Sequence, residues 1–280
     1  MLTLYGTVNI LIMISSLSLQ LSKAYKEHIC FKELEEMMTF YECLSERALY
    51  FFQSGTKGII NYESYVFMSI QGTLDSIKEL LLIGRINDAS VLIRKFFDDI
   101  LAEIYFAVTL KEKFDITKGL YVEEVQKWLE SKYRVPTLKR ILDIIRKSVY
   151  TKDLYPLFGW ETYLQHNRQI LDDCVHTNSY RNVLFNCNTV YLNNDREKRL
   201  DGILTILKQL MTIQVAFVFH LNPVYLMASD YLDYKEMGME PPLGSDSWIS
   251  PYGQDAYDKY IKPHTTLAKF IKDNCFLDIV

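Results

Sequence analysis

The chain has 280 residues, 49% of them hydrophobic, with a formal net charge of −4. This hydrophobic content excludes disorder over most of the length, and 11 glycines and 7 prolines are too few for an all-β fold with many turns. The slightly negative net charge excludes a general attraction of the whole chain to nucleic acid or anionic lipid.

The first 22 residues contain no charged side chain and are numerous enough to cross a bilayer. Polar residues dilute this segment, and no basic residue precedes it as in a signal peptide. We therefore prefer a buried first helix that continues into the apolar pattern after residue 30. A membrane anchor formed by residues 1–22 is the alternative.

Apolar residues recur at helical spacing along most of the chain. The pattern predicts helices at 60–83, 88–110, 120–133, 137–150, 160–175, 195–221 and 253–275. Residues 224–252 are rich in Pro, Gly, Ser and Asp, which is typical of loop. We expect an all-α multi-helix bundle with a long N-terminal helix over residues 1–223. Residues 224–280 would form an irregular, aromatic-rich C-terminal arm with a terminal helix.

The motifs of phosphate-binding loops, helical zinc sites and EF-hands do not occur in this sequence. No two of the five histidines are three or four residues apart, so neither a metal nor a cofactor is expected. The five cysteines are odd in number and form no CxxC pair, which disfavours a disulfide framework and indicates a cytoplasmic location.

Arg94 and Asp98 lie four residues apart in the predicted helix 88–110, and therefore on one helical face. Arg94 lies beside the apolar stripe, where a partly buried arginine needs a carboxylate from Asp98 or Glu103. One interpretation is a structural ion pair within the bundle. The other is an arginine that points into a cleft and binds a phosphate or a carboxylate.

A second polar group is concentrated in "HNRQILDDCVHTNSYR", residues 166–181. Asp172 and Asp173 precede His176 by four and three residues, so either carboxylate can reach its ring if the helix continues. Such a contact orients a histidine and raises its pKa, as a general acid or base requires. Arg168 and Arg181 could supply a cation, and Asn178 a further contact. The alternative is a polar helix end.

Eight Lys/Arg and only two acids lie between Lys127 and Lys152. These cations alternate with apolar residues, which is typical of amphipathic helices with a solvated face. They could also form a phosphate-binding surface. The candidates for phosphate contacts are Lys139, Arg140, Arg146 and Lys147.

The order of these pieces resembles the HEPN superfamily of helical bundles, found in prokaryotic toxin and antiphage systems, over residues of about 60–220. The helix "ASVLIRKFFDDILAEIYF" is similar to the family's LxRxxxE helix, with Arg94 at the arginine and Asp98 where a glutamate is common. The segment "LDDCVHTN" is similar to a downstream helix of related bundles. The resemblance implies a metal-independent RNA-cleaving site, often completed across a dimer. It assigns acid–base chemistry to His176 and charge stabilisation to Arg168. Here seven residues separate the two, more than the family's four to six.

We therefore expect an RNA-directed protein, a metal-independent endoribonuclease with His176, Arg168 or Arg181, and the Asp172/Asp173 pair in its site. It would self-associate as a dimer, and its C-terminal arm would suit contact with a protein partner. The alternative is a non-catalytic helical module that binds a partner protein or a nucleotide beside Arg94 and Asp98. A third interpretation is a helical protein tethered to a membrane by residues 1–22.

Overall fold

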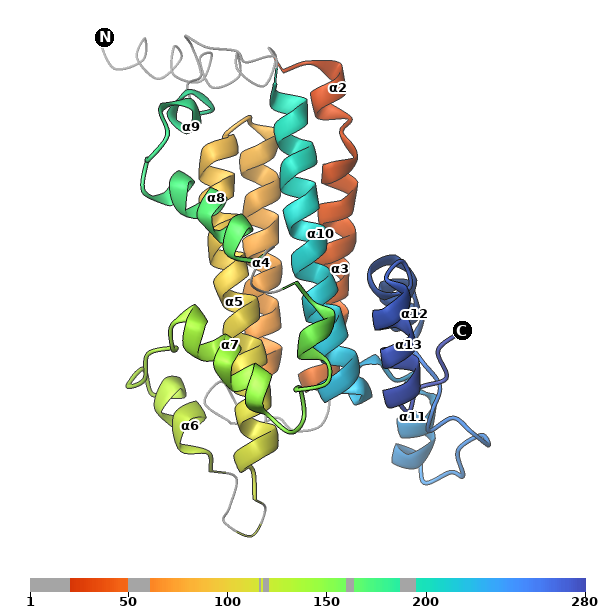
Figure 1. The fold of residues 1–280 in the computed structure, drawn as a ribbon. Coiled ribbons are helices and arrows are strands. Elements are labelled where there is room, and N and C mark those ends of the chain that lie inside the picture. Colours follow the sequence, from red (N-terminus) through yellow and green to blue (C-terminus); the bar gives the residue numbers. More distant parts are fainter. Residues whose placement is uncertain (1–20, 50–60, 116, 118–120, 160–163, 187–194) are drawn as a thin grey trace, which may run out of the picture.

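Four long helices run side by side and form the centre of the molecule (Figure 1). The computed structural model describes residues 21–49, 61–115, 117, 121–159, 164–186 and 195–280. Within these ranges no strand occurs, and the predicted all-α multi-helix bundle is confirmed. The four central helices are α3 (Ile29–Leu49), α4 (Tyr62–Leu82), α5 (Ile86–Lys113) and α10 (Arg196–Leu221).

Shorter helices cover two sides of this centre (Figure 1). Both α7 and α8 contact α5, whereas the C-terminal arm contacts α3 and α10. A single turn, α2 (Lys23–Lys26), precedes α3. The helices on the α5 side are α6 (Glu123–Leu129), α7 (Leu138–Lys147), α8 (Gln165–Val175) and α9 (Tyr180–Leu184). Those of the arm are α11 (Asp230–Glu236), α12 (Pro251–Ala256) and α13 (Thr265–Asn274).

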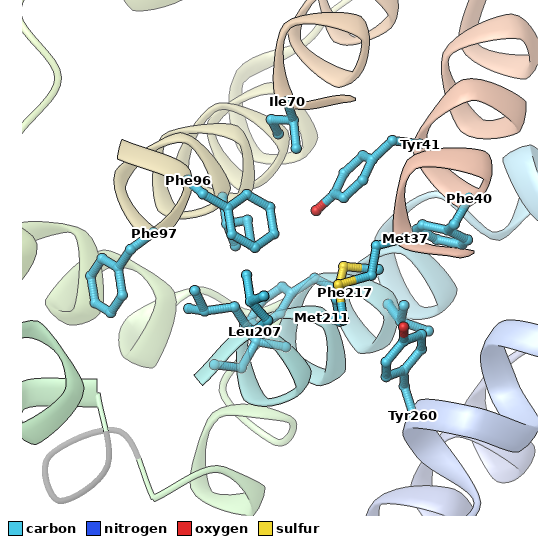
Figure 2. Packing of buried hydrophobic residues seen from close by; sticks show 14 of the residues in the cluster. Met37, Phe40, Tyr41, Ile70, Phe96, Phe97, Leu207, Met211, Phe217 and Tyr260 are labelled. Carbon is cyan, nitrogen blue, oxygen red and sulfur yellow. The ribbon is translucent and has the colours of Figure 1, made fainter. Parts of the chain in front are cut away.

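The central helices form because apolar side chains repeat at helical spacing and bury one another. On α5 the residues Ile93, Phe96, Phe97 and Ile100 are fully buried. Figure 2 shows Phe96 and Phe97 of α5 in the same cluster as Tyr41 of α3 and residues of α10. Each such side chain contributes roughly 1.5–3 kcal/mol when it leaves water. Packing of this cluster therefore holds the long helices together.

Two details of the C-terminal region differ from the predicted elements. The predicted helix 253–275 is interrupted. A π-helical segment (Tyr257–Ile261) follows α12 and ends just before Pro263, and α13 begins at Thr265. The segment 224–252 also contains the helix α11, which its polar composition did not indicate. The predicted anchor or first helix at 1–22 lies almost entirely outside the described residues.

One helix in the described part of the chain, α10, is long and apolar enough to cross a membrane by length and composition. However, 72% of its most apolar window is buried inside the protein. A core helix of a bundle has the same composition, and α10 packs against α3, α5 and α13.

A pair of carboxyl groups is buried between the central helices. Glu103 on α5 is 3% exposed, and Gln214 Nε2 on α10 donates a hydrogen bond to its Oε2 at 2.8 Å. Burial, together with the nearby Glu63 carboxyl, raises the pKa of Glu103 to about 8. Glu63 on α4 accepts hydrogen bonds from Tyr225 and, at 3.1 Å, from Asn222 Nδ2. Burial raises the pKa of Glu63 as well.

The raised pKa of Glu103 predicts that stability falls as the pH rises. The folded protein retains this proton up to about pH 8, whereas the unfolded chain releases it near the ordinary value of 4.5. Stability is therefore fully present below about pH 4.5 and is lost progressively up to about pH 8, on the order of 5 kcal/mol in total. Denaturant unfolding across this range should show a smaller loss for Glu103→Gln than for the wild type.

Glu112→Gln is the matched control, since it removes an exposed carboxylate from the same helix. It should keep the wild-type pH dependence. An unchanged pH dependence in Glu103→Gln would contradict the assignment of this titration to Glu103.

Candidate functional site

Arg94 links α5 to α8 from beneath the molecular surface. The residue is 9% exposed, and its guanidinium forms an ion pair with Asp98 one turn later, as the spacing predicts. Its Nε also donates to Asp172 Oδ1 at 2.7 Å, which joins residues 78 positions apart. Burial opposes the charged form, but the hydrogen bonds to Asp98 and Asp172 outweigh burial and raise the pKa of Arg94. Two carboxylates thus balance the charge of the buried cation.

Asp172 also faces a second arginine from its own helix. Arg168 Nε lies 3.5 Å from Asp172 Oδ2, one helical turn away. Two of the predicted cations, Arg94 and Arg168, therefore converge on one carboxylate. Among the described residues, the Asp172 carboxylate therefore contacts two arginines. The sequence suggested that it could orient His176 instead.

His176 lies at the end of α8 and is exposed. Thr177 follows with a φ of 55°, and the Asn178 N–H donates to the Asp173 carbonyl at 3.1 Å, which closes the helix as a Schellman-type turn. Because the helix ends here, the His176 ring makes no hydrogen bond or ion pair with another described residue. This stretch therefore has the geometry of a polar helix end.

The other predicted residues of this stretch have different partners. Asp173 accepts hydrogen bonds from Gln169 Nε2 at 3.3 Å and Asn178 Nδ2 at 3.4 Å. Arg181, on α9, pairs with Asp195 at 2.8 Å. The structure therefore brings Arg94, Arg168 and Asp172 together, and it leaves His176, Arg181 and Asp173 outside that group.

A groove of about 910 Å³ opens between α7 and α8, directly beside Asp172. Four cations line it, Lys139, Arg140 and Arg146 from α7 and Arg168 from α8. We call it the α7–α8 groove. Its remaining lining residues are Thr137, Leu138, Leu142, Asp143, Tyr155, Gln165, Gln169 and Asp172.

Both carboxylates of the α7–α8 groove are already neutralised by neighbouring cations. Asp143 accepts hydrogen bonds from Lys147 Nζ at 2.7 Å and from Arg146 Nη2 at 2.6 Å, and these lower its pKa. Asp172 is engaged by its two arginines. By contrast, the exposed side chains of Lys139 and Arg140 have no hydrogen bond or ion pair to another described residue. The groove therefore carries excess positive charge.

The N-terminus of α7 adds to this charge. Thr137, Leu138 and Lys139 at the start of the helix line the groove, and the first turn contains no acidic residue. The Thr137 side chain does not cap the helix. Backbone N–H groups and the positive end of the helix dipole thus lie at the groove, where they favour an anion.

The four cations of the groove could be named from the sequence, but the surface that they share could not. In the sequence, the basic residues 127–152 and the "HNRQILDDC" stretch are two separate candidates. The helical spacing does not show that α7 and α8 are neighbours. Gln165, Gln169 and Tyr155 were not among the predicted residues. The signal that could have found the two glutamines is the i, i+3, i+4 and i+7 spacing of Gln165, Arg168, Gln169 and Asp172 on one face of α8.

The described part of the chain contains no cluster of three or more His, Cys, Asp or Glu side chains that could hold a metal ion. No family model, curated protein or solved structure matches the chain. The arrangement of charges is therefore the basis for assigning a function.

Removal of Arg94 should destabilise the fold. In Arg94→Ala, Asp172 loses its buried partner and α8 loses its tie to α5, which should cost roughly 1–3 kcal/mol in the free energy of unfolding. Lys269→Ala is the control, because it removes only an exposed i,i+4 ion pair with Asp273 and should cost less than about 1 kcal/mol. Equal losses in denaturant unfolding of the two variants would show that Arg94 does not have this structural role.

Proposed function

We propose that this protein binds RNA, with the phosphates of a single-stranded segment in the α7–α8 groove. The observation that carries the proposal is the gathering of Lys139, Arg140, Arg146 and Arg168 around one groove whose two carboxylates are already paired. A polyanion gains affinity from such a surface because each neutralised phosphate releases a counterion. The resemblance to HEPN bundles points to the same class of ligand.

The shape of the groove also favours a chain of phosphates over a single one. The ten residues of α7 span roughly 15 Å, with cations at both its first and its last turns. Gln165 and Gln169 on the opposite wall offer amide groups that can donate to phosphate or accept from a ribose or base. Tyr155 offers an aromatic ring. Aromatic side chains and cations together are typical of surfaces that bind single strands.

We favour binding over cleavage. Cleavage without a metal would require a general acid or base beside the scissile phosphate, and His176 is the predicted candidate. Its exposed ring is engaged by neither Asp172 nor Asp173, and it does not line the groove. The competing hypothesis is that His176 joins a catalytic site formed with a second copy of the chain.

Lys139→Ala/Arg140→Ala should weaken RNA binding at least about tenfold, because each lost phosphate contact removes counterion release. The slope of log K against log[salt] should become shallower by about 1.4, since single strands give about 0.7 for each contact. Fluorescence anisotropy with a labelled oligoribonucleotide at several salt concentrations measures both quantities.

Lys23→Ala/Lys26→Ala is the charge-matched control, because it removes two exposed lysines from α2, away from the groove. This control should bind like the wild type. If both double variants lose affinity equally, binding depends on general charge and the proposed groove has no special part in it.

His176→Ala distinguishes binding from cleavage. We expect the wild type and His176→Ala to bind the oligoribonucleotide with the same affinity and to leave it intact in the presence of a chelator. Denaturing gel electrophoresis after incubation measures the integrity of the RNA. Chelator-resistant cleavage by the wild type that disappears in His176→Ala would establish the competing ribonuclease hypothesis instead.

A further inference from the structure

A second pocket lies on the other face of α8, between α8, α9, the start of α5 and the first half of α10. It has a volume of about 410 Å³, and Arg199, Lys198, His166, Asn182 and Phe185 line it. We call it the Arg199 pocket. We propose that it binds a small organic anion, a carboxylate or a phosphate monoester attached to an apolar body. This proposal is independent of RNA binding in the α7–α8 groove.

Arg199 is a half-buried cation without a carboxylate partner among the described residues. Its guanidinium carbon lies 4.6 Å from the centre of the Phe185 ring, and its Nη2 reaches Asn182 Oδ1 at a long 3.5 Å. The nearby Asp195 is occupied by Arg181 at 2.8 Å. Burial, and then repulsion from Arg181, lower the pKa of Arg199, although an arginine remains charged. A guanidinium in this position has donors left for a bidentate anion.

The other walls of the pocket suit the rest of such a ligand. Lys198 and His166 are exposed at its rim and add positive or hydrogen-bonding groups. Asn87 Oδ1 is buried and accepts no hydrogen bond from any residue that the structure describes, so a hydroxyl or amine on the ligand would satisfy it. The floor is apolar, formed by the buried residues Ile86, Leu171, Ile203 and Ile206. An anionic head near Arg199 and an apolar body over this floor therefore fit together.

Gly202 lies at the edge of the Arg199 pocket. It lies on the same face of α10 as Arg199 and Ile206, three and four residues away. A Cβ placed at Gly202 would meet no atom within 4 Å, so the backbone here borders open space. Gly202 is exposed at the edge of the pocket, so a larger side chain here can extend over its opening without a clash at its Cβ.

Isothermal titration with phenyl phosphate, benzoate, benzyl alcohol and inorganic phosphate tests the proposal. We expect saturable binding of phenyl phosphate or benzoate with a Kd near or below about 1 mM, as ligands of this size can reach. Whichever of these two anions binds more tightly shows whether the pocket prefers a phosphate or a carboxylate head group. Benzyl alcohol, which lacks the charge, and inorganic phosphate, which lacks the apolar body, should each bind at least about tenfold more weakly.

Two variants test whether the ligand binds in the Arg199 pocket. Arg199→Met keeps the packing on Phe185 but removes the charge, and should weaken binding at least about tenfold. Gly202→Leu should block binding while the protein stays folded, because leucine favours a helix more than glycine does. Gly72→Leu is its matched control, since Gly72 is also a helical glycine bordering open space, on α4 and outside the pocket. It should bind like the wild type.

The proposal is overturned if neither anion binds, or if benzyl alcohol binds as tightly as both. It is also overturned if the folded Gly202→Leu protein binds with wild-type affinity. Thermal unfolding of each variant shows whether it is folded, so Gly202→Leu decides the question even if Arg199→Met does not fold.

Discussion

The candidate site depends on one buried charge, the guanidinium of Arg94. An arginine that is 9% exposed requires anionic partners, and the chain provides Asp98 on the same helix and Asp172 on α8. The contact between Arg94 and Asp172 connects α8 to the central bundle at a defined position. Because Asp172 also faces Arg168, the same carboxylate is neutralised from both sides. Because Asp172 is already neutralised, the wall of the α7–α8 groove remains positively charged.

The helix α8 is the shared wall of two different surfaces. Its Gln165, Arg168, Gln169 and Asp172 face the α7–α8 groove, whereas its His166, Asn167, Ile170 and Cys174 face the Arg199 pocket. The first surface is open and strongly cationic, which suits an extended polyanion. The second is smaller, with an apolar floor and one arginine that has no carboxylate partner in the described part of the chain. Both require α8 to be held against α5, and the contact between Arg94 and Asp172 contributes to this together with the buried Leu171.

Much of the fold could be predicted from the sequence, because apolar residues at helical spacing mark each long helix. The pair Arg94–Asp98 could be predicted for the same reason, since it is local. The contact between Arg94 and Asp172 could not, because spacing along one helix says nothing about a partner 78 residues away. Similarly, the end of α8 depends on the left-handed conformation of Thr177, a non-glycine residue that carries no strong stop signal.

The most direct test of RNA binding in the α7–α8 groove is a map of the sites where photoactivated RNA cross-links to the wild-type protein. If the groove holds the RNA, the cross-linked peptides should contain residues 137–146 and 165–172, which form its two walls. Cross-links confined to the C-terminal arm or to α2, with none on α7 or α8, would contradict it.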